Sequence, residues 1–552
     1  MLDTLFNGSY KQLSTLERSM SEAENYDEWL ELAKQHDQLS GAVDWRHNNS
    51  STIYDHRNLQ ARLTNLQELA RNKDDFGLMF ALNEGIHGNM GGMGSAKLHA
   101  KAKCGTKFLI ESYVEEIQRS LQRLAPSASD SIPLGERREF FKRASHCYGR
   151  SALMLSGGGT LGSFHLGVVK VLIEHNMLPV VISGSSAGSF VSAIVGTRTD
   201  KQFLRLFTGD ALSTALTAGN DDLDFRFGKS QSIDISALED SLARMIPDMT
   251  FAEAFQKTGR SINISVSPSE PKQTSRLLNH IASPNVLIRS AVLASCAIPG
   301  IFPSVRLEAR NAKGEKQAYL PSRRWIDGSF SQDLPAKRLA RMYGVNHFLV
   351  SQVMPVLGSE KKKKPFLTEL ITDASIAATK QIVRSSFDFM QRRLQLGSNA
   401  ATAFTAANAM IEQSYSGDVN IFPGFGILSL GKILKKLSAE ETTEIIRAGE
   451  RATWAKVATI RTTTAIGSTL DEIMKEFEMR SARLVHDAST STATASKVSK
   501  SAESDSDEPK QVAKKAPKKA SKKVPLKKST KKRAKASTKT TARRSKAQLK
   551  SG

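Results

Sequence analysis

The chain has 552 residues, and its 78 lysines and arginines outnumber its 55 acidic residues to give a formal net charge of +23. This length allows two or three domains of roughly 100–200 residues each. Apolar residues make up 40% of the chain, so most of it can bury a core. The chain has no run of about 18 apolar residues, which is the length that would predict a membrane-spanning helix. These sums exclude a small secreted scaffold and an integral membrane protein, but not a nucleic-acid binder.

The cysteines and the N-terminal residues indicate which cellular compartment the protein occupies. Cys104, Cys147 and Cys296 are too few, and odd in number, for a disulfide framework, which favours a reducing environment. Met1–Tyr10 has no basic segment followed by an apolar core, so no secretory signal is visible. We therefore expect a cytoplasmic protein.

The first 125 residues are predicted to form a helical domain. Apolar residues recur three and four apart in two segments, Asp27–Gln35 and His56–Leu69. A glycine-rich stretch, Gly85–Gly105, then predicts a loop or a closely fitting surface. The polar residues 126–149, which include proline and serine, are predicted to be a linker.

Short apolar runs alternate with helical patterns in residues 150–355. The runs predicted as buried strands are Ala152–Leu155, Val180–Ile182, Ile262–Val266 and Phe348–Val353. Amphipathic segments such as Gly162–His175 lie between them. This alternation predicts an α/β fold, in which helices cover the faces of a parallel or mixed sheet.

Two further regions follow. Residues 356–486 are predicted to be mostly helical, and the stretch 366–396 within them is interpreted as a helix on the sheet or as an amphipathic segment on a membrane surface. Residues 487–552 are almost entirely Ala, Ser, Thr, Lys and Pro, which predicts disorder. Eighteen lysines and arginines and no acid lie in residues 509–552, so the basicity belongs mostly to this tail.

The pentapeptide Gly184-Ser185-Ser186-Ala187-Gly188 follows an apolar run and precedes a helical pattern. This is the strand–turn–helix setting of a nucleophile elbow, with an ordinary tight turn as the alternative. Gly184 and Gly188 must be small for strand and helix to pass closely. Ser186 is then held in a strained position with its hydroxyl exposed, and the helix dipole lies beneath it.

A glycine-rich loop, which includes Gly157, Gly158, Gly159 and Gly162, follows the first predicted strand. Consecutive glycines let backbone amides point into a cavity, where they can bind a phosphate or the oxyanion of acyl transfer. The loop has neither the G-x-G-x-x-G spacing of a dinucleotide site nor the Lys-Ser/Thr of a P-loop, which argues against a nucleotide site. Because the loop precedes an elbow serine in the sequence, an oxyanion hole is favoured.

The third signal is Asp327 followed by Gly328. An Asp before Gly is usually structural, because it caps its own backbone. A serine hydrolase, however, needs a base. None of the 11 histidines is an obvious candidate, and those considered include His165, His280 and His347. A carboxylate can replace histidine if it accepts the serine proton directly.

These three motifs together resemble the patatin-like phospholipases. Other blocks resemble the branch of that family that contains the yeast and plant-seed triacylglycerol lipases and carries a helical domain before the patatin domain. The blocks are Tyr26–Trp29, Asp44–Trp45, Tyr54–Asp55, Gly105–Glu111, Ala294–Pro303, Asp327–Pro335 and Val345–Val353. The resemblance covers roughly residues 10–430.

The resemblance implies a three-layer α/β/α domain and a Ser–Asp dyad. Ser186 is then the nucleophile, Asp327 the base and the glycine loop the oxyanion hole, with no metal and no cofactor. The implied reaction is hydrolysis of a lipid acyl ester through an acyl-serine intermediate, with triacylglycerol favoured. Phospholipids or lysophospholipids and a storage polyester or wax ester stay open. Leu161 stands where many patatins carry a basic residue, which removes a charge that could help hold a phosphoryl group.

An enzyme of this kind must reach insoluble lipid, so we expect peripheral association with a membrane or a lipid inclusion. Candidate docking segments are the loop around Met90 and Met93, the Ala297–Phe302 turn and the stretch 366–396, each of which also has a core interpretation. Residues 510–550 could bind DNA or anionic lipid non-specifically, or only solubilise the chain. The competing class is a non-catalytic scaffold that tethers lipid inclusions to DNA.

Overall fold

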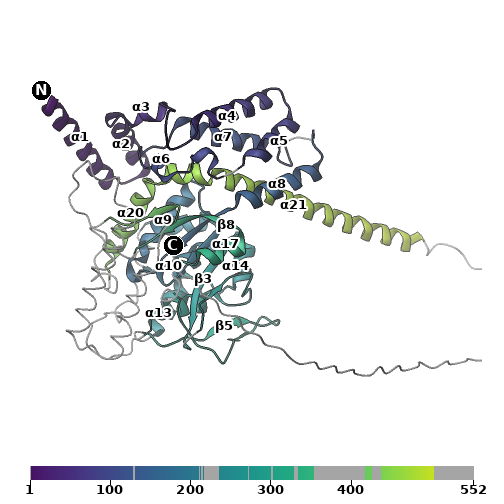
Figure 1. Ribbon diagram of the computed structural model, residues 1–552. Coiled ribbons are helices and arrows are strands. Elements are labelled where there is room, and N and C mark those ends of the chain that lie inside the picture. Colours follow the sequence, from purple (N-terminus) through teal and green to yellow (C-terminus); the bar gives the residue numbers. More distant parts are fainter. Residues whose placement is uncertain are drawn as a thin grey trace, which may run out of the picture. The chain divides into compact units, whose positions relative to one another are not determined.

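The computed structural model describes residues 2–86, 88–128, 131–209, 212, 215–216, 235–270, 273–299, 302–328, 334–353, 417–424 and 437–502 (Figure 1). The helices are α1 (Leu2–Glu22), α2 (Tyr26–Leu39), α3 (Ala42–His47), α4 (His56–Arg71), α5 (Asp75–Gly85), η1 (Met90–Gly92), α6 (Ala96–His99), α7 (Phe108–Arg123), α8 (Leu134–Tyr148), η2 (Gly159–Gly162), α9 (Ser163–Glu174), α10 (Ala187–Gly196), α11 (Asp200–Leu204), η3 (Arg205–Phe207), α13 (Ile235–Met245), α14 (Phe251–Thr258), α15 (Ile288–Cys296), α17 (Ala336–Tyr343), α20 (Ala439–Trp454) and α21 (Val457–Ala502). The strands are β1 (Arg150–Leu155), β2 (Val181–Gly184), β3 (Ser261–Pro268), β4 (Arg276–Leu278), β5 (Leu307–Arg310), β6 (Lys316–Tyr319), β7 (Trp325–Asp327), β8 (Val345–Ser351) and β9 (Val419–Ile421).

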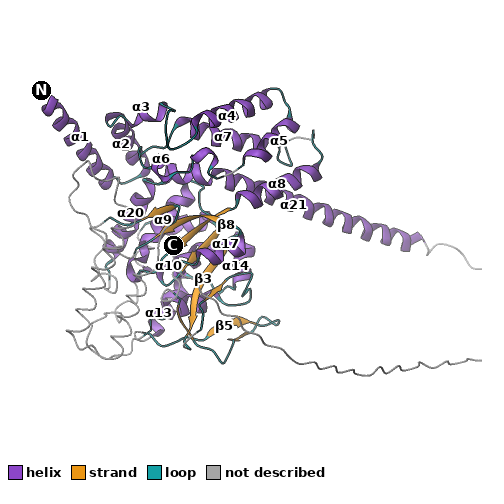
Figure 2. Ribbon diagram, viewed as in Figure 1, coloured by secondary structure: helices purple, strands orange, loops and turns teal. Residues whose placement is uncertain are grey.

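The central sheet is mixed and runs in the order β4–β3–β2–β1–β8–β9 (Figure 2). Strands β3, β2, β1, β8 and β9 are parallel to one another, whereas β4 and β7 run antiparallel to β3. The four runs predicted as buried strands are β1, β2, β3 and β8, with bounds shifted by a few residues. The prediction of an α/β fold with a parallel or mixed sheet is confirmed.

Helices cover both faces of this sheet. Side chains alternate along β1, so Leu153 and Leu155 lie in the core on one face and Ala152 and Met154 in the core on the other. The first core also holds side chains of α9, α10 and α15, and the second holds Leu339 of α17. The result is the expected three-layer α/β/α arrangement.

Helix α20, in the C-terminal region, packs so closely on α9 that the backbones of the two helices touch. A Cβ added to Gly167 of α9 would lie 2.0 Å from the carbonyl oxygen of Ile446, and one added to Gly449 of α20 would lie 2.1 Å from that of Phe164. Only glycine allows so close an approach. The described part of the predicted C-terminal helical region therefore thickens one outer layer.

The N-terminal helices divide between two cores. Side chains of α4, α5, α7, α8 and α21 form a separate helical core, which includes Leu59, Tyr113 and Phe477. Helix α2 instead contributes Trp29 and Ala33 to the core beneath the sheet. The predicted helical domain is thus present, and its second helix also anchors it on the α/β domain.

Two predicted boundaries differ from the structure. The predicted linker 126–149 contains α8, because the adjacent Phe140 and Phe141 are buried in the helical core. Helix α21 continues into the predicted tail as far as Ala502, through a stretch without proline or glycine. The rest of that tail, 503–552, lies outside the described residues.

The docking segments predicted for lipid are only partly visible. Met93 is buried in the helical core, so the glycine-rich loop does not present it to a surface. The stretch 366–396 lies outside the described residues. None of the helices in the part of the chain that the structure describes is long and apolar enough to cross a bilayer.

Candidate active site

The chain turns sharply at Ser186 between the end of β2 and the start of α10. Its backbone angles are φ 50° and ψ −122°, which residues with a side chain rarely adopt. A Cβ added to Gly184 would lie 2.1 Å from the carbonyl oxygen of Gly188, and one added to Gly188 would lie 2.2 Å from that of Leu155. Strand and helix pass at backbone contact, as an elbow requires. Ser186 is buried, with 6% exposed, rather than open to solvent as expected.

The glycine-rich loop that follows β1 lies against this turn. Gly159 has a φ of 56°, in the left-handed region that favours glycine. A Cβ added to Gly162 would lie 2.5 Å from the Cβ of Ala187, the first residue of α10. The loop therefore reaches the N-terminal end of α10, where the helix dipole favours negative charge. The elbow and the loop, predicted separately, form one site.

The strand pairing brings Asp327 to the same place. β2 pairs with β3 as far as Gly184 opposite Ile264, and β7 pairs with β3 from Pro268 to Val266, with Asp327 opposite Val266. β4 pairs with Ile264 and Val266 as well, so it occupies the other edge of β3. β2 and β7 must then share one edge of β3, where their ends meet head to head.

Only Ser265 of β3 separates these two ends. A Cβ added to Gly328 would lie 2.4 Å from the carbonyl carbon of Ser265, so the chain after Asp327 turns directly over that residue. Ser186 follows the end of β2 by two residues. The nucleophile and base predicted from the sequence therefore lie at one junction. The next residues of that motif, 329–333, lie outside the described residues.

Asp327 is fully buried beside the end of α15. Its backbone N–H donates a 3.0 Å hydrogen bond to the carbonyl of Ala297. Burial, and then the negative charge of Asp327, raise the pKa of the Cys296 thiol to about 12. Ala297 is itself fully buried. The start of the predicted Ala297–Phe302 docking turn therefore holds the aspartate strand in place.

Ser295 is a candidate positioning residue that the sequence patterns did not indicate. Its hydroxyl accepts a 3.0 Å hydrogen bond from the backbone N–H of Ser186 and donates a 2.8 Å bond to the carbonyl of Ser265. It is fully buried. One side chain thus ties the strained turn to the strand that separates the ends of β2 and β7. The only sequence signal was its place in a block that resembles the lipase branch.

Replacing Ser295 by alanine should leave the Ser186 N–H and the Ser265 carbonyl buried without a partner. We expect a loss of roughly 1–3 kcal/mol in the free energy of unfolding. We also expect kcat to fall by about 10- to 100-fold with little change in KM, because the nucleophile shifts. Denaturant unfolding and steady-state ester hydrolysis measure both effects.

Ser290→Ala is the matched control for that substitution. Ser290 is a buried serine on the same helix, and its hydroxyl bonds to Leu287 and Glu308 rather than to the elbow. It should cost stability and leave kcat unchanged. Equal kcat in the two variants would contradict the positioning role of Ser295.

The glycine-rich loop after β1 is held in place by hydrogen bonds of His165. The ring Nε2 lies 3.0 Å from the carbonyl oxygen of Ser156, which can only accept, so Nε2 donates. Nδ1 then accepts from the hydroxyl of Ser351 at 2.7 Å. Ser156 Oγ in turn donates to the carbonyl of Gly157. Both ring nitrogens are occupied, so His165 supports the glycine loop and is not a base for the serine.

The other two histidines considered as bases also have structural roles. His280 stacks on Phe255 with ring centroids 3.9 Å apart. His347 bonds to the hydroxyl of Ser151 at 3.0 Å, near the start of β1 and so at the opposite end of the sheet from the elbow. Neither is placed to serve Ser186.

Burial lowers the pKa of His165 to about 4, from 6.5 in an exposed histidine. Between those values the unfolded chain binds a proton that the folded chain does not, so stability rises with pH. The free energy of unfolding is therefore highest above pH 6.5. It falls by about 3 kcal/mol as the pH drops to 4, because the unfolded chain gains a proton that buried His165 does not. Unfolding measured at several pH values should show this slope, reduced in His165→Gln and unchanged in the variant of exposed His146, His146→Gln. An equal slope in all three proteins would contradict it.

Two known domain families match parts of the described structure. Residues 7–146 match a domain of unknown function (DUF3336), and residues 153–340 match the patatin-like phospholipase domain. The first of these covers most of the predicted helical domain. The second contains the elbow, the glycine loop and Asp327.

Three relatives with curated names are similar over most of the chain. Triacylglycerol lipase 4 of Saccharomyces cerevisiae is 33% identical over 83% of this chain and 53% of its own length. Triacylglycerol lipase SDP1L of Arabidopsis thaliana is 32% identical over 82% and 57%. The chain thus spans little more than half the length of these two. Triacylglycerol lipase ptl3 of Schizosaccharomyces pombe is 31% identical over 81% of this chain and 94% of its own. The chain belongs to the patatin-like phospholipase family, in the branch that holds these triacylglycerol lipases.

Proposed function

We propose that this chain hydrolyses acyl esters of lipids, with Ser186 as nucleophile and Asp327 as the base that accepts its proton. The observation that carries the proposal is the head-to-head meeting of β2 and β7 on one edge of β3. That arrangement joins a strained serine to a buried aspartate. A protein that only tethers lipid needs neither the strain nor the burial.

The chemistry is acyl transfer. As Ser186 attacks the ester carbonyl, its proton passes to the Asp327 carboxylate, and an acyl-serine forms as the alcohol leaves. Backbone amides of the loop that contains Gly157, Gly158 and Gly159 stabilise the oxyanion, at about 2.7–4 kcal/mol per donor in other hydrolases. Water then releases the fatty acid. Packing of Gly162 on Ala187 supports this assignment, because it brings the loop to the serine.

Triacylglycerol is the substrate that we propose. The relatives that match most of the chain carry the name triacylglycerol lipase. Leu161 of the glycine loop is buried and apolar, so it offers no charge to a phosphoryl group. Since such a substrate is insoluble, we also propose that the protein acts peripherally on a lipid surface. The basic residues 510–550 would add non-specific attraction to an anionic surface.

Product analysis tests this proposal. The purified chain is incubated separately with triolein emulsion, phosphatidylcholine vesicles and a polyester suspension, and the released acids are quantified. We expect the highest rate with triolein and none with Ser186→Ala. A higher rate with phosphatidylcholine would replace triacylglycerol by phospholipid as substrate. No release from any ester by the wild type would contradict the enzymatic proposal.

A further inference from the structure

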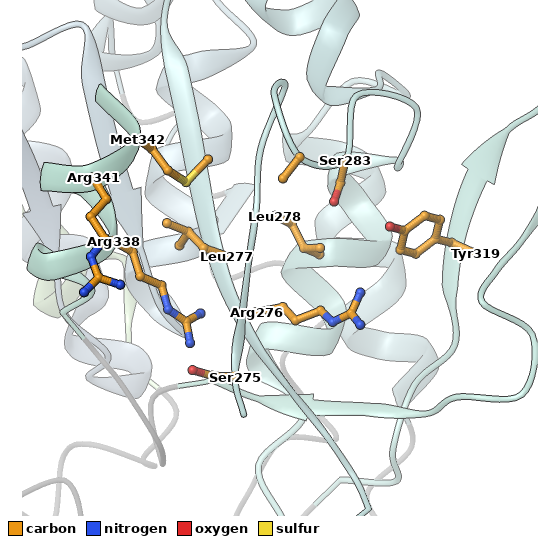
Figure 3. Close-up of a pocket in the computed structure, with 10 residues that line it drawn as sticks. Ser275, Arg276, Leu277, Leu278, Ser283, Tyr319, Arg338, Arg341 and Met342 are labelled. Carbon is orange, nitrogen blue, oxygen red and sulfur yellow. The ribbon is translucent and has the colours of Figure 1, made fainter. Parts of the chain in front are cut away.

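A pocket of about 350 Å³ lies at the β4 edge of the sheet (Figure 3). It is lined by Ser275 and β4, by the turn at Ser283, by Tyr319 of β6 and by α17. In Figure 3 the arginines of α17 extend on one side of β4, and Arg276 extends on the other side toward Tyr319. The side chains that line the pocket therefore come from both sides of an edge strand.

Three positively charged side chains line this pocket from the two sides of β4. Arg276, Arg338 and Arg341 all line it. Within the described ranges, the side chain of none of the three forms an ion pair or a hydrogen bond, and that of Arg276 lies over the ring of Trp325. Arg338 and Arg341 are three positions apart on α17, so they share one side of that helix and repel each other. Arg338 is half-buried, and burial lowers the pKa of its guanidinium. An anion in the pocket would relieve both costs.

The chemistry of the lining selects the kind of anion. Guanidinium groups bind phosphate through paired N–H donors, and Ser275 and Tyr319 add hydroxyls. The rest of the lining is apolar, from Leu277, Leu278 and Met342. A fully hydrated small anion gains nothing from that apolar surface. A phosphate attached to an apolar tail matches both parts.

The pocket also lies in register with the candidate active site. Arg276 pairs with Val266 of β3, and Val266 pairs with Asp327 on its other edge. Neighbouring strands lie about 4.8 Å apart, which puts the backbone of Arg276 roughly 10 Å from that of Asp327. The guanidinium of Arg276 lies 5.6 Å from the ring centre of Trp325, the first residue of the aspartate strand. A surface held by this pocket is thus held next to the dyad.

We propose that the pocket lined by Arg276, Arg338 and Arg341 binds the phosphate of an anionic phospholipid headgroup and fixes the active-site end of the sheet on a lipid surface. This binding step does not depend on hydrolysis. Its test can therefore fail or succeed independently of the proposed lipase activity.

The test is co-sedimentation of the full chain, carrying Ser186→Ala to prevent turnover, with vesicles of four parts phosphatidylcholine and one part phosphatidic acid. Substituting the three pocket arginines together by glutamine should weaken binding at least about tenfold. Vesicles of phosphatidylcholine alone should bind weakly and show no difference. Thermal unfolding verifies that the variant is folded.

A matched control separates the pocket from general charge, including that of the basic tail. Arg57, Arg138 and Arg143 are exposed arginines of α4 and α8, and their substitution by glutamine removes the same charge. This triple variant should lose less than about twofold. Equal losses in the two triple variants would overturn the proposal. It would also be overturned if soluble glycerol 3-phosphate stabilised the wild type but the pocket variant bound vesicles normally, because the pocket would then serve a free phosphate.

Discussion

Ser186→Ala is expected to lower kcat for ester hydrolysis by at least about 10⁴-fold, because no other group can form the acyl intermediate. Asp327→Asn should lower it by a similar order, since the amide cannot accept the serine proton and keeps nearly the same shape. Both variants should fold, with circular dichroism and denaturant unfolding close to the wild type. The measurement is steady-state hydrolysis of a soluble chromogenic ester, which needs no lipid surface.

A serine in α10, the helix that follows Ser186, supplies the control. Ser192 is buried on α10, and its hydroxyl donates only to the carbonyl of Ser189 within the helix. Ser192→Ala should keep kcat within about threefold of the wild type while costing roughly 1 kcal/mol of stability. Substantial activity in Ser186→Ala or in Asp327→Asn would remove the dyad from the mechanism.

Gly184→Ala is expected to destabilise the fold by about 3 kcal/mol or more. The new methyl would lie 2.1 Å from the carbonyl oxygen and 2.3 Å from the carbonyl carbon of Gly188. Both are backbone atoms of the helix that follows, so no side chain can move aside. The elbow must open, and activity should be lost with stability. Urea unfolding of the two proteins gives the difference.

Gly135→Ala is the control for that substitution. Gly135 lies in the first turn of α8, and a Cβ there would meet nothing within 4 Å. Its substitution should change stability by no more than about 1 kcal/mol, with a slight gain from the reduced freedom of the unfolded chain. If Gly184→Ala were as mild, the close approach of strand and helix would not be what fixes Ser186.

Local patterns were enough to predict the parts of the site that depend on neighbours in sequence. Glycine is required at 184 and 188 because the chain turns there between two adjacent elements. The strand and the helix on either side are predicted by short-range periodicity. The glycine loop after β1 was predictable for the same reason. These residues report a steric requirement that is visible in the sequence itself.

The contacts that complete the site join distant parts of the chain. Ser295 bonds to Ser186 across 109 positions, and no periodicity relates the two. Asp327 lies near the end of β2 only because β7 pairs antiparallel with β3, and a three-residue strand does not encode that pairing. Likewise, Gly167 and Gly449 each resemble an ordinary helix glycine until α9 and α20 are placed together. Long-range packing decided these features.

Covalent labelling tests the central claim most directly. The wild-type chain is treated with a fluorophosphonate, digested, and mapped by mass spectrometry. The account predicts a single adduct on Ser186 that forms in step with the loss of esterase activity, and a much slower reaction in Asp327→Asn. Loss of activity with the adduct on another serine, or full activity after complete labelling of Ser186, would contradict it.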